Sequence, residues 1–336
     1  MKRNLIIPLL ANLILGILSL ANASEIVTVD SFVRAETDTT FGRYVNMGAL
    51  GKFLHIRQPT PVEKQDVIRM NRDTLYSMGV FDLTTPLTIV KPASNGRFQS
   101  MMVISQDHSM LPIEHGAGEF TLTKEKVGTR YALVIMRTFI DANDPVDIDA
   151  ANALQDKIAV RQETPGKFEI PDWDEPSLKK VRDAINVLAA TRTSAKGMFG
   201  DKAKLNPLSH LLGTAFGWGG NPDEAAAYDN VVPATNDGKI AYRLTVKDVP
   251  VDGFWSITVY NKDGFMEKNA QNVYSYNNVT AKKNADGGIT INFGGSPDAI
   301  NNLPITPGWN YIVRMYQPKQ KIINGSWNFP KAQPTE

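Results

Sequence analysis

Short apolar segments separated by turn residues fill two long stretches of the chain. In the first stretch they span residues 74–83, 87–90, 98–105, 119–123 and 131–139. In the second they span 240–247, 254–260, 288–293 and 311–316. Short runs that are rich in β-branched and aromatic residues and are bounded by Gly, Pro, Asn and Asp are typical of strands. The pattern predicts two β-rich modules, each a sandwich or a barrel.

Helical periodicity appears before and between these two stretches. A first helix is expected from Asp30, as its N-cap, to about Gly42. Residues 147–160 and 177–195 have apolar residues at helical spacing, and Ser177 is placed to cap the second of them.

A glycine-rich segment follows these helices. Residues 217–222 contain three glycines and must form a loop. We therefore expect residues 147–230 to be a helical connector ending in a Gly-rich loop. The fold class is mainly β with a helical connector and two β-sandwich or barrel-like modules.

The segment 254–260 alternates strictly between its two faces. Trp255, Ile257 and Val259 share one face, and Phe254, Ser256, Thr258 and Tyr260 share the other. We expect the first face to be core and the second to be at least partly in contact with water.

The first 23 residues have the features of a cleaved secretion signal. Lys2 and Arg3 precede an apolar run, residues 5–20, which is followed by Ala21-Asn22-Ala23. This run is too short and too interrupted to be a comfortable membrane-spanning helix. We expect cleavage before Ser24, a periplasmic or secreted location, and no membrane span after cleavage.

Composition narrows the classes of function. The chain has no cysteine, which excludes disulfides, thiol nucleophiles and Cys-ligated metal centres. Its 36 Lys and Arg nearly balance its 35 Asp and Glu, and it has no dense basic run. Nucleic-acid binders usually carry a basic excess, so we expect no nucleic-acid partner. A small molecule, a carbohydrate or another copy of the chain remains as a partner.

Two groups of residues resemble known domains. Residues 32–38, 68–77 and 81–83 resemble domain of unknown function 1254. Residues 253–260, 263–265, 272–275, 311–325 and Trp327 resemble its usual C-terminal companion, domain of unknown function 1214. The resemblance implies an exported two-module protein, commonly bacterial, with no established chemistry and no catalytic residue to transfer. We place the modules at residues 24–146 and 231–336.

Local catalytic and cofactor motifs are missing from the sequence. It contains no convincing nucleophile elbow, zinc helix, P-loop or dinucleotide fingerprint, and we expect no cofactor. His108 and His115 lie near Asp107, Glu114 and Glu119, which are residue types that bind Zn, Mn or Fe. Because this spacing matches no standard set of metal ligands, we expect loop histidines and no metal site.

The densest polar run before a strand is Asn71-Arg72-Asp73, with Tyr76 beyond it. Arg72 offers a planar fork of donors and Asp73 offers acceptors, so together they could hold a polar ligand. The structural alternative is a buried link between Arg72 and a carboxylate, with Asp38, Glu36 or Asp73 as its partner.

Aromatic residues concentrate in the second half of the chain, where their rings could stack on a sugar or simply fill a core. Trp255 and Arg314 are the candidates there, because an Arg on a strand face needs a carboxylate or a ring as a partner. Together the candidate ligand-binding residues are Asn71, Arg72, Asp73, Tyr76, His108, Trp255 and Arg314.

Three functions remain open. The first is binding of a small polar or carbohydrate-like ligand. The second is a hydrolase or lyase with an Arg/Asp/His polar centre, and the third is a structural homo-oligomer. Convergence of Arg72, Asp73 and His108 or His115 in one cleft would favour the enzyme. An open aromatic groove would favour binding, and a flat apolar patch would favour assembly.

Overall fold

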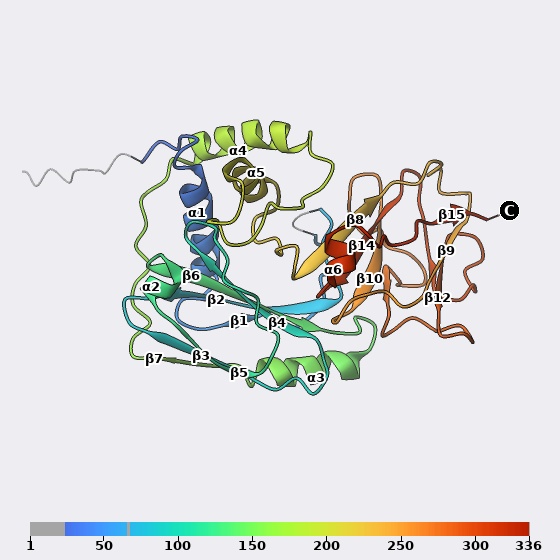
Figure 1. Ribbon diagram of the computed structural model, residues 1–336, viewed down its shortest axis with the longest axis horizontal. Coiled ribbons are helices and arrows are strands. Elements are labelled where there is room, and N and C mark those ends of the chain that lie inside the picture. The colour runs from blue at the N-terminus through green and yellow to red at the C-terminus, as the bar shows by residue number, and fades with distance from the viewer. Residues whose placement is uncertain (1–23, 66–67, 336) are drawn as a thin grey trace, which may run out of the picture.

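The computed structural model describes residues 24–65 and 68–335. The expected secretion signal, residues 1–23, lies outside them. The described chain forms two bodies that lie side by side, with the N-terminal half on the left of Figure 1 and the C-terminal half on the right.

The N-terminal body is built on two antiparallel sheets. The larger sheet has the order β1-β2-β6-β4 and the smaller has the order β5-β3-β7. The strands of the larger sheet are β1 (Leu54–His55), β2 (Thr74–Asp82), β6 (Tyr131–Phe139) and β4 (Gln99–Ser105). Those of the smaller sheet are β5 (Gly118–Leu122), β3 (Leu87–Lys91) and β7 (Ala159–Gln162).

Helices cover the face of the larger sheet that points away from the smaller one (Figure 1). These helices are α1 (Phe32–Asn46), α4 (Glu175–Ala189) and α5 (Pro207–Gly217). The opposite face packs on the smaller sheet through residues such as Phe81, Met101 and Leu87. Two further helices, α2 (Lys124–Val127) and α3 (Pro145–Gln155), complete this body. The N-terminal body therefore has three layers, and α4 and α5 form part of its helical layer.

The C-terminal body is a sandwich of two sheets. One sheet has the order β11-β10-β14-β8 and the other has the order β13-β12-β9-β15. The first contains β11 (Ser275–Asn277), β10 (Trp255–Tyr260), β14 (Asn310–Tyr316) and β8 (Ala226–Val231). The second contains β13 (Asn302–Leu303), β12 (Ile289–Phe293), β9 (Tyr242–Val246) and β15 (Gln333–Pro334), and α6 (Gln320–Ile323) follows β14. Ile257, Val313 and Ile291 lie in the core between the two sheets.

The second face of β10 differs from the sequence expectation, because all six residues of this strand are buried. Its inner face fills the sandwich core, as expected. Its outer face packs on the N-terminal body, where Phe254 and Tyr316 meet Phe139 and where Tyr260 meets Met70. A periodicity of two residues separates the faces of a strand but does not show what covers each face. The covered outer face of this sheet makes the junction of the two bodies.

Two expected helix caps are wrong. The first helix has Ser31 rather than Asp30 at its N-cap position, and no side chain caps it. The cap of α4 is Asp174, whose carboxylate accepts a hydrogen bond from the backbone N–H of Ser177 at 2.9 Å. The helix α5 lies in a stretch that the sequence pattern left without a helix. Its cap is Asn206, which accepts from the backbone N–H of Ser209.

The mainly β fold class is confirmed by four open sheets in two sandwich-like groups. Within residues 24–65 and 68–335, no helix combines the length and the apolar character needed to cross a membrane.

Candidate functional site

Five of the seven candidate residues lie at the junction of the two bodies, and one of them is Arg72, whose guanidinium lies over the ring of Tyr274 in the C-terminal body. Asn71 and Asp73 lie just before or at the start of β2, and Tyr76 lies on β2. Arg314 lies on β14, on the outer face of the C-terminal sandwich, since it pairs with Ser256 in the register of β10 and β14. The start of β2 in one body thus meets the outer face of the β11-β10-β14-β8 sheet in the other, and polar side chains fill the contact.

Arg314 is buried and fully engaged in the junction. Its guanidinium donates to the hydroxyls of Thr258 at 2.9 Å and Tyr260 at 2.7 Å. It also donates to the carbonyl of Arg69 at 2.8 Å, which crosses from the C-terminal to the N-terminal body. Burial lowers the pKa of Arg314, but Tyr260, Tyr316 and Asp73 raise it by more, so it stays charged.

Asp73 supplies the negative charge near Arg314. Its carboxylate accepts from the hydroxyl of Ser275 at 3.4 Å, and its backbone N–H donates to the side chain of Asn71 at 2.8 Å. Its Oδ2 atom is buried and has no hydrogen-bond partner among the described residues. Burial raises the pKa of Asp73, and the charge of Arg314 opposes this rise. Asp73 and Arg314 therefore attract each other without forming a direct ion pair.

Tyrosines form the second part of the junction. The side chain of Asn71 donates to the hydroxyl of Tyr316 at 2.8 Å. The ring of Tyr316 stacks on Phe254 with centroids 4.4 Å apart. Burial, with Tyr228 and Tyr76 nearby, raises the pKa of Tyr316 well above its ordinary value. Tyr316 is therefore a neutral phenol at neutral pH, and it accepts a hydrogen bond from one body while it packs in the other.

Arg137 is a junction residue that the sequence analysis missed. It pairs with Tyr76 in the register of β2 and β6, and its guanidinium lies 5.6 Å from the centroid of the Tyr76 ring. It donates to the carbonyl of Gly219 at 3.2 Å. The available signal was a single charged residue in the otherwise apolar strand 131–139, since an isolated buried charge requires a partner.

The expected carboxylate partner of Arg72 is wrong. Arg72 is buried, but it donates to the carbonyl of Thr60, and its guanidinium lies 5.3 Å from the centroid of the Tyr274 ring. Glu36 is instead paired with Arg182.

Asp38, another expected partner of Arg72, accepts hydrogen bonds from Gln106 and Trp173. The reason for the difference is local. Asp73 contacts Ser275 and lies near Arg314, whereas the preceding residue, Arg72, contacts Thr60 and Tyr274.

His108 lies away from the polar junction, beneath the loop that follows α5. Its Nδ1 is 2.9 Å from the hydroxyl of Thr214, and its Nε2 accepts from the backbone N–H of Gly219 at 3.0 Å. Its ring stacks on His210 and Trp218. Both ring nitrogens are therefore engaged by the protein.

The other residues of the expected histidine cluster do not gather around His108. Asp107 pairs with Arg34 and Lys202, and Glu119 pairs with Arg161. The ring of His115 packs against Phe98. In the part of the chain that the structure describes, no group of three or more His, Asp or Glu side chains could hold a metal ion.

Trp255 belongs to the sandwich core and not to the Arg314 surface. It is opposite Met315 in the register, one position from the Ser256–Arg314 pair, so it faces the other side of the sheet. Its ring makes an edge contact with Phe329 at 5.2 Å. Alternation along β10 explains why these two candidates cannot share a surface.

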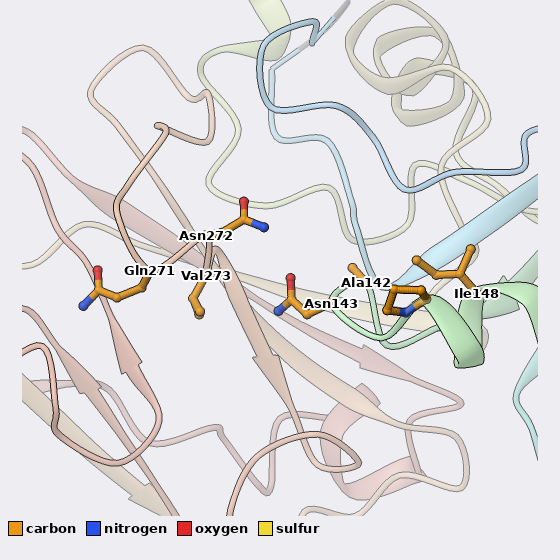
Figure 2. Close-up of a pocket in the computed structure, with 7 residues that line it drawn as sticks. Ala142, Asn143, Ile148, Gln271, Asn272 and Val273 are labelled. Atoms are coloured by element: carbon orange, nitrogen blue, oxygen red, sulfur yellow. The ribbon is translucent and has the colours of Figure 1, made fainter.

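A cleft opens at the edge of the junction (Figure 2). Its volume is about 420 Å³. One wall comes from the segment between β6 and α3 and from the start of α3, and the other wall comes from the segment before β11. The lining residues are Ala142, Asn143, Pro145, Ile148, Gln271, Asn272 and Val273.

The cleft is lined by uncharged residues, and three of the seven carry side-chain amides. Asn143 and Gln271 are exposed, and their side-chain amides make no hydrogen bond with the described residues. Asn272 accepts at Oδ1 from the hydroxyl of Tyr274 at 3.1 Å, which leaves its NH₂ group for other partners. The remaining lining side chains are aliphatic, so the cleft offers hydrogen-bond donors, acceptors and an apolar wall, but no charge and no aromatic ring.

A second cavity of about 500 Å³ lies on another side of the junction, between residues 93–98, α3 and the region of Phe254. Arg97 and Asp147 line it, and they form an ion pair at 2.5 Å. Arg97 and Asp147 already satisfy each other, but Lys157 also lines this cavity and makes no ion pair with the described residues, so the cavity carries a positive charge that the amide-lined cleft lacks.

Comparisons with known proteins agree with this two-body architecture. Residues 50–162 match the family described as protein of unknown function DUF1254, and residues 226–320 match the family described as protein of unknown function DUF1214. These are the halves in which the sequence resemblance was expected. No curated protein sequence matches the chain.

Solved structures also resemble the chain. The crystal structure of the VPA0106 protein from Vibrio parahaemolyticus has a TM-score of 0.69 at 19% identity, covering 92% of this chain and 98% of that one. An uncharacterised protein from Burkholderia cenocepacia has a TM-score of 0.49 at 14% identity, covering 87% of this chain and 86% of that one. The Vibrio structure supports the fold, and neither protein is described with a function.

Proposed function

The chain belongs to the proteins that join a DUF1254 domain to a DUF1214 domain, and we propose that it binds a small, neutral, hydroxyl-rich ligand of the carbohydrate type. The proposed site is the cleft between residues 142–148 and 271–273. Ligand sites are frequently found between domains, and its volume lies in the range of about 300–1,000 Å³ that is typical of small-molecule pockets.

The observation that carries this proposal is the set of three amides in an uncharged lining. A sugar hydroxyl both donates and accepts, and an amide offers a donor and an acceptor in one plane. Asn143 comes from one wall of the cleft, and Gln271 and Asn272 come from the other, so a ligand in the cleft could bond to amides of both bodies (Figure 2). The aliphatic side chains of Pro145 and Ile148 could pack against the carbon face of a sugar ring.

The placement of the other candidates favours binding over catalysis. Three candidates for an acid–base centre have different neighbours. Arg72 contacts Thr60 and Tyr274, and Asp73 contacts Ser275 and lies near Arg314. His108 contacts Thr214 and Gly219. An acid–base centre needs these groups within hydrogen-bond reach of one substrate.

Replacing both free amides should weaken ligand binding. We expect the double variant Asn143→Ala, Gln271→Ala to bind its best neutral mono- or disaccharide about tenfold or more weakly, because each lost hydrogen bond is worth roughly 0.5–1.5 kcal/mol. Titration calorimetry against a panel of neutral and charged sugars measures this. Both positions are exposed, so the thermal midpoint should not change.

The matched control is Asn328→Ala, an exposed amide elsewhere in the C-terminal body. This variant should bind as the parent does. Equal binding by the double variant and the parent, or a preference for charged over neutral sugars, would contradict the proposed site.

We also propose that the protein works outside the cytoplasm after removal of residues 1–23. The charged start, the apolar run and Ala21-Asn22-Ala23 support this proposal. Mass spectrometry of the protein recovered from the periplasm or the medium should give a chain that begins at Ser24. A dominant species that retains residues 1–23 would contradict export by cleavage.

A further inference from the structure

Arg137 is a buried cation that has no ion-pair partner among the residues that the structure describes. Its side chain is on β6, and the residue is only 6% exposed. None of the ion pairs between described residues involves it. Its Nη1 atom is buried and has no hydrogen-bond partner among these residues. Because an unpaired buried charge is costly, a protein that retains one usually uses it.

The neighbouring charges do not compensate for Arg137. Arg314, the other buried arginine of the junction, already has Asp73 nearby. Arg69 reaches the junction too, where it donates to the side chain of Asn310 at 3.0 Å. Among the described residues, Arg137 and Arg314 are therefore two buried guanidinium groups of the junction, and Asp73 is the buried carboxylate near them.

Phenol groups surround Arg137 on the helix side of the sheet. The ring of Tyr76 lies beside its guanidinium, and the charge of Arg137 lowers the pKa values of Tyr44 and Tyr228 against the larger rise that burial causes. The side chains of Tyr44 and Tyr76 are half-buried. Their hydroxyls make no hydrogen bond with the described residues and are not among the enclosed atoms without a partner. Solvent can therefore reach these donors next to a free guanidinium atom.

Two backbone contacts fix the guanidinium in this position. The carbonyl of Gly219 accepts from Nη2 of Arg137, and the N–H of the same residue donates to His108. Since His108 is itself bonded to Thr214 of α5, the helical layer holds Arg137 and leaves Nη1 free.

We propose that Arg137 and the hydroxyls of Tyr44 and Tyr76 form a binding site for a small organic carboxylate. The guanidinium supplies the positive charge and a strong charge-assisted donor, and the two phenols supply further donors to the anionic oxygens. This site shares no residue with the amide-lined cleft, so it is independent of the neutral ligand proposed there.

The charge of the site selects the class of anion. One guanidinium is neutralised by one negative charge, whereas a phosphate dianion would leave an excess negative charge in a buried region. The rings of Tyr76 and Tyr228 also give the surroundings an apolar character that suits the organic part of a carboxylate. A monocarboxylate matches both properties.

Thermal unfolding of the full chain with sodium acetate, benzoate, phosphate or chloride at equal ionic strength tests this site. We expect both carboxylates to raise the midpoint in a concentration-dependent way, and phosphate and chloride to have little effect. Arg137→Met should abolish the carboxylate effect. Tyr76→Phe should keep the fold and raise the carboxylate concentration needed for a given shift about tenfold, since one charge-assisted donor is lost.

The matched control is Tyr276→Phe, a half-buried tyrosine of β11 whose hydroxyl makes no hydrogen bond with the described residues. This variant should respond to carboxylates as the parent does. An undiminished carboxylate shift in Arg137→Met, or a larger shift with phosphate than with either carboxylate, would overturn the proposal. If Arg137→Met does not fold, an unchanged response of Tyr76→Phe overturns it instead.

Discussion

His108 is kept neutral by its surroundings. The residue is completely buried, and burial lowers its pKa to about 3, with a smaller contribution from His210. Its Nε2 accepts from Gly219, so Nδ1 carries the proton and donates to Thr214. A second proton on Nε2 would place two donors face to face. The network therefore works only with the neutral imidazole.

The stability of the protein should fall as the pH is lowered below about 6.5, because the unfolded His108 takes up a proton there and the folded one does not until a pH of about 3. Each such group contributes a slope of about 1.4 kcal/mol per pH unit within this window. We expect His108→Asn to reduce the slope between about pH 5 and pH 6 by this amount, as measured by urea denaturation.

Asn is the suitable replacement because His108 has a positive φ of 53°, which Asn tolerates better than most residues. The pKa of His115 is also lowered, to about 4, so His115→Asn serves as a parallel variant that should remove its own share of the slope. An unchanged slope in His108→Asn would show that His108 is protonated in the folded protein.

Arg72 should stabilise the protein less than a buried ion pair would. Arg72→Ala removes a charged donor to the carbonyl of Thr60 and a contact with the ring of Tyr274, but it leaves no carboxylate uncompensated. We expect a loss of about 1–3 kcal/mol in the free energy of unfolding, as measured by urea denaturation. The exposed Arg43→Ala should change it by less than about 0.5 kcal/mol.

Arg72→Lys separates the two contacts of Arg72. Lys can still donate to one carbonyl, but it lacks the flat guanidinium that stacks on a ring. This variant should therefore recover part of the loss. A loss of about 4–5 kcal/mol in Arg72→Ala, with no recovery by Lys, would indicate a paired carboxylate and contradict the contacts described.

At the scale of elements, the strands with two buried faces were the easiest to predict. The segment 131–139 was expected as a strand and is β6 with the same bounds, because a short apolar run that is bounded by turn residues and enriched in β-branched and aromatic residues is typical of a strand covered on both faces. The short edge strands β1, β7 and β13 carried no such pattern. Their positions depend on the partner strand and not on their own residues.

The helix α5 was not predicted, because the sequence around it contains residues that indicate a loop. Its segment is flanked by Gly and Pro residues, which indicate a loop when each is taken alone. In the structure Pro207 occupies the first turn after the Asn206 cap, and Gly213 lies against the backbone of Met198, where a Cβ would come within 2.7 Å of a carbonyl oxygen. The glycine serves close packing here and does not break the helix.

The residues of the candidate site were predictable only in part. The polar run at 71–76 was visible because it stands out before an apolar strand, and all four of its candidates reach the junction. The amides of Asn143 and Gln271 gave no signal, because single exposed amides are common in loops. Only the contact between distant parts of the chain makes them neighbours.

At the scale of the whole molecule, the mainly β, two-part architecture followed from the pattern of strands, but the contact between the parts did not. Alternation led us to expect that the second face of segment 254–260 is at least partly in contact with water. That face is polar and also buried, because residues of the N-terminal body complete its hydrogen bonds, as Asn71 does for Tyr316. A single sequence contains no local signal that shows which residues of one body bond to which residues of the other.

The buried outer face of the C-terminal sandwich means that neither half of the gene can be lost without exposing buried residues of the other half. A gene that lost its N-terminal half would leave Phe254 and Tyr316 facing water, and Arg314 would lose the carbonyl of Arg69 and the charge of Asp73. A gene that lost its C-terminal half would leave Asp73 and Asn71 without these partners. We therefore expect the two halves to be duplicated, transferred and lost together, as a single heritable unit.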